Sequence, residues 1–409
     1  MKKTLIVLAT LAATAGVASA ANVTVFGAAD LGLSYKYSKV QSEVQTVKKD
    51  TYGLESGNYG ASKFGLKGTE ELGNGLSVGF KLENGFTADD GRLGQDNRLF
   101  GREASLNISG AFGTVYAGRM GALSSGAGTL DIFQAYADVF DGGVGDIGAG
   151  YWHGTGRYDN TVAYVTPDMA GLKLYAQYGF QNDGSEKASA RDNSRYWGVG
   201  ATYDNGPLAL VAVFDSVQPA NKSVDDLTKE YALKGDLTKL GLNQDSFTLS
   251  FGGSYDFGSF KPFVGVQYGK HMNTFGGIGN FDYNGGDFAV ADLKGYALSL
   301  GSTFDLPCGT LTGVLYYAHS KGDSVFATDK GKKFQSGLIE AKGNLYGIGL
   351  VHAYPLSKRT TFYSGVGYAY GKYTGTGGIV SDDRTEIYGG DETVKTKNAQ
   401  VLFGLNHTF

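Results

Sequence analysis

The residues that could carry chemistry gather in one segment that differs from the rest of the chain. This segment, between Arg119 and Arg157, is Gly-rich at both ends. Its middle carries apolar residues at helical spacing: Ile132, Phe133, Tyr136, Val139 and Phe140. A short amphipathic helix can pack that side on a wall, which leaves the acidic side chains to other directions: Asp131, Asp138 and Asp141. We expect these acidic groups to point into the space that the wall encloses.

Other chemistry-bearing patterns do not form a site. Gly143, Gly145 and Gly148 have the spacing of a dinucleotide fingerprint but lack the strand before it and the helix after it. The five His residues have no metal-ligand spacing, and no local Ser, His and Asp set suggests a hydrolase. The acidic runs at 89–90 and 382–383 are interpreted as solvated loop charge rather than as divalent-cation sites. We expect no enzyme activity, no metal and no cofactor.

The composition points to β-structure as the scaffold for that segment. Of 409 residues, 65 are Gly, 27 are Tyr, 24 are Phe and 2 are Trp. Gly without a tripeptide period excludes collagen, and so much Tyr and Phe excludes a disordered linker. Gly and aromatic residues are poor helix formers but are typical of turns and twisted strands. A helical protein is therefore not expected.

The two ends of the chain and its charge indicate export. Lys2 and Lys3 precede an apolar run, and residues 18–20 (Ala-Ser-Ala) supply a cleavage pattern, so residues 1–20 are predicted to be a signal peptide. The domain 21–409 then has a net charge of −6, because the signal removes two of the 36 basic residues and none of the 40 acidic ones. Such a chain has no reason to bind nucleic acid. The one Cys, Cys308, is interpreted as an inert turn residue.

Alternation of apolar and polar residues dominates the chain from Val23 to Phe409. Phe247, Leu249 and Phe251 share one face, with Thr248 and Ser250 on the other. About sixteen such segments run from 22–35 and 58–70 to 397–409, and eighteen would also fit the length. No apolar stretch after the signal is long enough for a transmembrane helix. A soluble β-protein and a membrane barrel therefore remain.

The connections between these segments favour the barrel. Short turns rich in Gly, Asn, Asp and Pro alternate with long polar connections such as 36–57 and 218–244. This order is typical of an outer-membrane barrel, which must close because unpaired backbone groups cannot face lipid. A β-sandwich would also alternate, but it would not place aromatic residues at so many strand ends. We expect an all-β, 16-stranded, antiparallel up-and-down transmembrane β-barrel.

Several short stretches together resemble the Gram-negative general porin family, especially its β-proteobacterial and neisserial branch. They are residues 25–27 (Val-Phe-Gly), 63–73 (Lys-Phe-Gly-Leu-Lys-Gly-Thr-Glu-Glu-Leu-Gly), 82–86 (Leu-Glu-Asn-Gly-Phe), 100–102 (Phe-Gly-Arg), 112–115 (Phe-Gly-Thr-Val), 118–119 (Gly-Arg), 156–161 (Gly-Arg-Tyr-Asp-Asn-Thr) and the terminal Phe409. The resemblance implies a homotrimer whose third loop folds inward and narrows the pore. It also implies a constriction in which Lys63, Arg102 and Arg157 form a basic wall that faces Asp138 on the loop.

Strand parity gives a separate test of the basic wall. Lys63 alternates with outward Phe64, and Arg157 alternates with Tyr158, so both are expected to point inward. Arg102 instead shares parity with the apolar Leu106, which requires a bulge or a strand buried at a subunit contact.

The sequence also departs from the family pattern at the constriction. The usual Glu of the third-loop motif is absent, and Asp141 or Asp146 could take its place. The first strand offers Asp30 where many members carry an inward Lys. The sign of ion selectivity therefore stays open.

The combined expectation is a passive outer-membrane channel for small hydrophilic solutes. Opposed charges across a narrow gap favour polar solutes that can orient in the field. Expected partners are outer-membrane lipid, lipopolysaccharide and the barrel-assembly machinery, for which Phe409 resembles the family's C-terminal signal. The alternatives are a substrate-specific channel and a barrel that serves mainly as an adhesin or structural anchor.

Overall fold

The computed structural model describes most of the chain. The described residues are 23–43, 46–126, 128–137, 151–152, 156–180, 193–219, 244–272, 275, 281–283, 286–322, 324–329, 334–335, 340–381 and 386–409. The predicted signal peptide lies outside them. Within them, no helix is long and apolar enough to cross a membrane.

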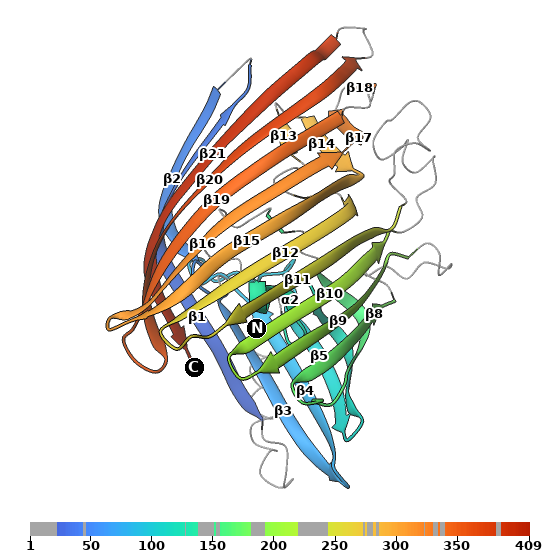
Figure 1. Cartoon of the computed structure of the whole chain (residues 1–409), viewed down its shortest axis with the longest axis vertical. Coiled ribbons are helices and arrows are strands. Elements are labelled where there is room, and N and C mark those ends of the chain that lie inside the picture. The colour runs from blue at the N-terminus through green and yellow to red at the C-terminus, as the bar shows by residue number, and fades with distance from the viewer. Residues whose placement is uncertain are drawn as a thin grey trace, which may run out of the picture.

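The chain forms a closed antiparallel β-barrel with sixteen strand positions, as predicted (Figure 1). The barrel strands are β1 (Thr24–Gln41), β2 (Thr46–Ser56), β3 (Lys63–Gly73), β4 (Leu76–Gly85), β5 (Glu103–Gly110), β6 (Gly113–Gly121), β7 (Arg157–Val165), β8 (Leu172–Gly179), β9 (Arg195–Asn205), β10 (Leu208–Gln218), β11 (Ser246–Tyr255), β12 (Phe260–Met272), β15 (Leu293–Leu306), β16 (Gly309–Gly322), β19 (Glu340–Pro355), β20 (Thr360–Ser381) and β21 (Glu386–Thr408). β2 and β3 share one position beside β1, and β21 pairs with β1 to close the ring.

Shorter elements lie outside this ring. β13 (Phe281–Tyr283), β14 (Gly286–Ala291) and β17 (Ser324–Asp329) form a separate three-stranded sheet, and β18 (Phe334–Gln335) pairs with β20. The predicted long connection 36–57 also differs from the structure, because β1 continues to Gln41 and β2 returns from Thr46 as a hairpin. Backbone pairing between β1 and β2 thus continues through most of the residues that were predicted to be a loop.

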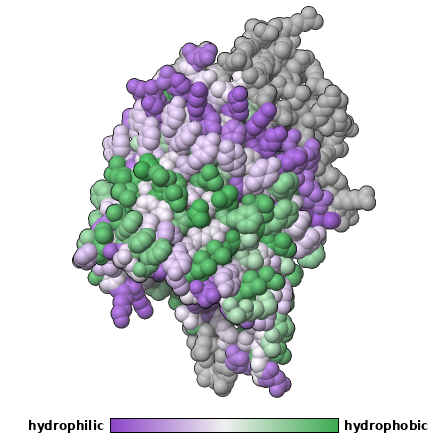
Figure 2. Space-filling model, in the orientation of Figure 1, coloured by the Kyte–Doolittle hydropathy of each residue, from purple (hydrophilic) through white to green (hydrophobic). Residues whose placement is uncertain are grey.

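The alternation predicted from sequence separates an apolar outer face from a more polar inner face. On β21, Val401 and Phe403 are 50% and 47% exposed, whereas Gln400 and Leu402, which alternate with them, are buried. Figure 2 shows a band of hydrophobic surface across the strands, with hydrophilic surface above it and at the tips below. An exposed apolar band of this kind is typical of the lipid-facing surface of an outer-membrane barrel.

A belt of aromatic rings follows the outer face at one rim of this band. Consecutive strands from β8 to β20 contribute one ring each: Tyr178, Trp197, Phe214, Phe247, Tyr268, Tyr296, Tyr317, Tyr346 and Tyr370. Neighbouring centroids lie as close as 5.1 Å, between Tyr317 and Tyr346. Amphipathic rings at this position are typical of a membrane–water interface.

The segment between β6 and β7, residues 122–156, is called the inward segment below. Its described residues pack against inward-facing residues of the barrel. Its one described helix, α2 (Phe133–Ala137), contacts β10, β11 and β12. Phe133, Tyr151 and Trp152 are buried with strand residues in a single apolar cluster. Gly347 gives Tyr151 its place, because a Cβ there would lie 2.0 Å from the tyrosine hydroxyl. The described part of the predicted amphipathic segment is therefore helical over Phe133–Ala137, whereas Val139 and Phe140 lie outside the described residues.

Candidate functional site

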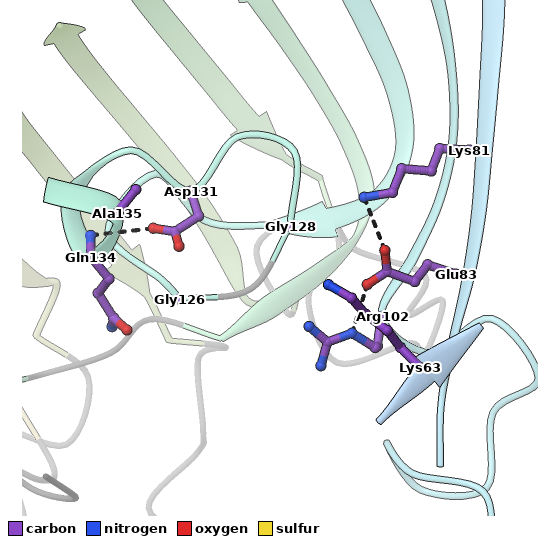
Figure 3. A pocket seen from close by; sticks show the side chains of 9 residues that line it. All are labelled: Lys63, Lys81, Glu83, Arg102, Gly126, Gly128, Asp131, Gln134 and Ala135. Atoms are coloured by element: carbon purple, nitrogen blue, oxygen red, sulfur yellow. Dashed lines mark hydrogen bonds and ion pairs between the residues drawn. The ribbon is translucent and has the colours of Figure 1, made fainter. Parts of the chain in front are cut away.

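A polar cavity lies between strands β3–β5 and the segment that follows β6. Its volume is about 260 Å³. The wall contributes charged side chains, and the segment contributes small and polar residues: Lys63, Lys81, Glu83, Arg102, Gly126, Gly128, Asp131, Gln134 and Ala135 (Figure 3). We call this space the constriction cavity. Lys63 and Arg102 of the barrel wall and Asp131 of the segment line it together, as an inward-folded third loop that faces a basic wall would require.

An ion chain crosses the wall side of the constriction cavity. The Lys81 ammonium lies 3.1 Å from the Glu83 carboxylate, and the Arg102 Nε donates to the same carboxylate at 2.6 Å. Lys81 and Glu83 share the inner face of β4, because Phe80 and Leu82 pair with outward residues of β5. Glu83 is buried and therefore depends on both cations for its stability.

A second carboxylate ties this wall to the inward segment. Glu103 is buried and accepts hydrogen bonds from the Thr129 amide at 3.2 Å and the Thr129 hydroxyl at 2.8 Å. It also accepts from Ser105 and lies 2.9 Å from the Lys81 ammonium. Thr129 precedes Asp131 by two residues, so Glu103 fixes the stretch that presents Asp131 to the cavity.

Further contacts hold the two ends of the described part of this segment. The Leu123 amide donates to the buried Tyr196 hydroxyl at 3.1 Å, and the Gln177 amide donates to the Gly121 carbonyl at 2.9 Å. The Tyr136 hydroxyl donates to Asp204 at 2.9 Å. Burial, together with that hydrogen bond, raises the pKa of Tyr136 far above its usual value, so the hydroxyl remains a donor. Together with the Glu103 contacts, these hydrogen bonds fasten the segment to three strands, β5, β8 and β9.

Lys63 and Arg102 line the constriction cavity, and both are placed there by the start of a strand. Lys63 is the first residue of β3 and pairs with Ala28 and Gly85. Arg102 directly precedes β5, whose pairing with β4 begins at Glu103. The parity conflict at Arg102 therefore needs neither a bulge within β5 nor a buried strand, since the residue lies outside the ladder.

Arg157 has a different setting from the one that alternation predicts. The pairing of β6 with β7 shifts between Gly118 and Met120, where Asn160 has a φ of 52°. Beyond this bulge Tyr158 is buried and stacks on Tyr196, whose hydroxyl contacts the inward segment. The bulge therefore puts Tyr158 on the inner side, and the parity argument for Arg157 was wrong.

The acidic residues of the expected constriction are only partly within the described chain. Asp131 lines the cavity, and its carboxylate accepts from the Gln134 amide at 3.3 Å. Asp138, Asp141 and Asp146 lie outside the described residues. Asp30, considered as an extra lumen charge, is fully buried and held by neighbouring donors, so it adds no exposed carboxylate.

The arrangement places charges of opposite sign around one cavity. Lys63, Lys81 and Arg102 meet Glu83 and Asp131 around one cavity, which creates a field across it. Among the described residues, no group of three His, Cys, Asp or Glu side chains could hold a metal ion. Sequence reasoning missed Lys81, Glu83 and Glu103, although alternation along β4 and β5 places all three on the inner face.

Comparisons with known proteins agree with this architecture. The family model described as Gram-negative porin matches residues 6–376. An outer membrane porin protein of Bordetella pertussis is 30% identical over 95% of this chain and 98% of its own. Outer membrane porin protein 32 of Delftia acidovorans is 29% identical over the whole of both chains.

A solved structure shares the fold over nearly the same length. The anion-selective porin from Comamonas acidovorans superposes with a TM-score of 0.61 at 24% identity, covering 95% of this chain and 100% of its own. The family match spans far more than half of the sequence and includes both sides of the constriction cavity. The chain therefore belongs to the Gram-negative porin family.

Proposed function

We propose that this passive diffusion channel of the outer membrane filters small hydrophilic solutes at the constriction cavity. The observation that carries the proposal is the ion chain Lys81–Glu83–Arg102 on the wall, with Asp131 on the segment across the same cavity. A polar solute that turns its dipole into this field is stabilised while it loses part of its hydration. An apolar solute gains no such compensation, so it crosses more slowly.

The charge balance around the cavity supports weak ion selectivity. Lys81 and Arg102 are neutralised by Glu83 and Glu103, which leaves Lys63 against Asp131 among the remaining lining charges. The fold neighbour from Comamonas acidovorans is named an anion-selective porin. We propose a weaker preference for this chain, because its wall cations are largely compensated.

Reversal potentials in planar bilayers test this filter. Under a KCl gradient we expect an ion-permeable channel whose potential lies near zero, and we expect Asp131→Asn to shift it toward anions. Asp256→Asn is the control, because Asp256 is an exposed turn residue at the end of β11 that bonds locally to the Gly258 amide. An unchanged potential in Asp131→Asn would remove that residue from the filter. A closed barrel without steady conductance would favour the anchor or adhesin alternative.

We also propose the assembly that the sequence suggested. The aromatic belt ends at Tyr370, whose partner on β21 is Lys397, and that residue faces Lys39 of β1. A belt that is interrupted on one side of the barrel supports a subunit contact there, as in a homotrimer, with lipid and lipopolysaccharide against the remainder. Cross-linking followed by mass determination of the detergent-solubilised protein tests the trimer.

Export and insertion form the last part of the proposal. Residues 1–20 act as a signal peptide, and Phe409 acts as the signal for the barrel-assembly machinery. Phe409 exchanges two backbone hydrogen bonds with Gly27, both 3.0 Å, so the last residue also closes the ring. The N-terminal sequence of the outer-membrane form tests the first point, and the membrane yield of a chain lacking Phe409 tests the second. We propose no catalytic activity.

A further inference from the structure

The ladder between β1 and its neighbours contains more residues than it can pair. Ala28 pairs with Lys63, and Leu31 pairs with Ser56. Only residues 29 and 30 lie between these positions on β1, whereas six residues, 57–62, lie between them on the opposite side. Four residues must therefore leave the plane of the sheet. Gly57, with a φ of 81°, marks the point of departure.

The extra residues fold onto the inner face of the barrel. Asp30 is on that face, because Leu33 and Tyr35 expose the opposite parity of β1 to the outside. Its carboxylate accepts backbone hydrogen bonds from Asn58 at 2.9 Å, Tyr59 at 3.4 Å and Gly60 at 3.2 Å. The segment thus covers Asp30 from the lumen side.

Two further strands hold the same carboxylate. The Tyr363 hydroxyl of β20 donates to it at 2.9 Å, and the Asn406 amide of β21 donates at 3.0 Å. Tyr59 stacks on Tyr363 with centroids 5.2 Å apart and an interplanar angle of 14°. A Cβ on Gly404 would lie 2.5 Å from the Tyr363 hydroxyl, so glycine is what lets this tyrosine reach Asp30. Three strands therefore fix the segment.

The segment lies at the level of the constriction cavity. Ser62 donates to the Asp30 carbonyl at 3.1 Å and is followed directly by Lys63, which lines the cavity. Tyr59 and Gly60 remain partly exposed, whereas Asn58 and Ser62 are buried. None of residues 57–62 carries a charged side chain.

We infer that residues 57–62 form a second inward-folded segment that narrows the lumen beside Lys63, and that Asp30 is the residue that positions it. The inference deepens the proposed filter at the constriction cavity by adding an uncharged part to it. Because none of its side chains is charged, this segment limits solute size without setting ion selectivity.

Thiol modification tests whether the segment faces the conducting path. The only Cys in the chain, Cys308, is exposed and is first replaced in Cys308→Ser. Gly60→Cys in that background is then treated with a bulky, neutral thiosulfonate reagent. We expect a stepwise loss of single-channel conductance. Ser259→Cys is the control, because Ser259 is exposed in the short turn that joins β11 to β12 and does not lie on the inner face of a strand. Its conductance should not change.

Asp30→Asn tests how the segment is held. Whichever way the new amide is turned, its NH2 faces an existing donor, either the Asn58 amide or the Asn406 side chain. We expect higher conductance and faster permeation of large neutral sugars, with an unchanged reversal potential. A changed potential at constant conductance would mean that Asp30 acts as a lumen charge and would overturn the inference.

The two proposals fail in distinguishable ways. Unaltered conductance of Gly60→Cys, with modification verified by mass, overturns the second segment even if Asp30→Asn does not fold. The charge filter depends instead on the reversal potential of Asp131→Asn, which the thiol experiment does not involve.

Discussion

The Glu103 carboxylate accepts hydrogen bonds from both the amide and the hydroxyl of Thr129, a residue 26 positions further along the chain. Glu103 belongs to the barrel wall and Thr129 to the inward segment, so this contact joins the two sides of the constriction cavity. It also places Lys81 between two carboxylates, 3.1 Å from Glu83 and 2.9 Å from Glu103. The position of the segment and the charge of the wall therefore depend on the same residue.

Replacing Glu103 with Ala should loosen the inward segment. The change removes the acceptor for Thr129 and leaves the Lys81 ammonium with one carboxylate. Losing such buried hydrogen bonds costs about 1–3 kcal/mol. We expect noisier single-channel currents with additional conductance levels. Thr129→Val is the graded control. It removes the hydroxyl but keeps the hydrogen bond from the backbone amide of residue 129 to Glu103, so it should give a smaller effect. Quiet currents in Glu103→Ala would show that other contacts suffice.

Lys81→Gln should move ion selectivity toward cations. Without the ammonium, the buried carboxylates Glu83 and Glu103 lose part of their compensation. The effect should be larger in 0.1 M than in 1 M KCl, because the screening length falls from about 10 Å to about 3 Å. Reversal potentials at the two salt concentrations measure it. Lys173→Gln serves as the control, because Lys173 is more exposed and lies 3.8 Å from Asp168 at a turn. Equal shifts in both variants would contradict a local effect.

Much of the barrel could be predicted from sequence because its signal is local. Alternation and turn residues locate a strand without knowledge of its neighbours, and the same parity placed Lys63 on the inner face. Parity failed at Arg157 because the bulge beside Asn160 inserts a residue that alternation alone does not reveal. Arg102 showed the converse, since its parity conflict disappears once the strand is known to begin at Glu103.

Contacts between distant parts of the chain could not be predicted in this way. Asp30 and Asn406 are 376 positions apart, and only the closure of the ring brings them within 3.0 Å. The predicted strand 58–70 began too early, inside the segment 57–62 that leaves the sheet. Local residue types in this segment do not distinguish it from the strand that follows. The four extra residues of segment 57–62 are recognised only when the pairing of β1 with β2 and with β3 is known.

Gly347→Ala should displace the ring that anchors the far end of the inward segment. The new Cβ would lie 2.0 Å from the Tyr151 hydroxyl, and the Tyr151 ring stacks on Tyr316 with centroids 4.7 Å apart. Overpacking of this kind costs about 1–3 kcal/mol. We expect a lower unfolding temperature and altered conductance. Gly313→Ala on β16 is the matched control, because its nearest neighbour would be Leu350 at an ordinary 3.4 Å. Equal unfolding temperatures of the two variants would contradict the packing of Tyr151 against Gly347.

Tyr196→Phe should release the start of the inward segment while leaving the barrel closed. The Tyr196 hydroxyl is fully buried and is the acceptor of the Leu123 amide. Phenylalanine keeps the stacking on Tyr158 but leaves that amide without its acceptor, at a cost of about 1–3 kcal/mol. We expect faster hydrogen exchange in peptides that cover residues 122–133, measured by mass spectrometry in detergent, with unchanged exchange in β9. Tyr203→Phe is the control, since the Tyr203 hydroxyl accepts from the exposed Asn205 two residues away and not from the inward segment as far as the structure describes it. Protection that persists in Tyr196→Phe would assign the anchoring to Gln177, whose amide bonds the Gly121 carbonyl.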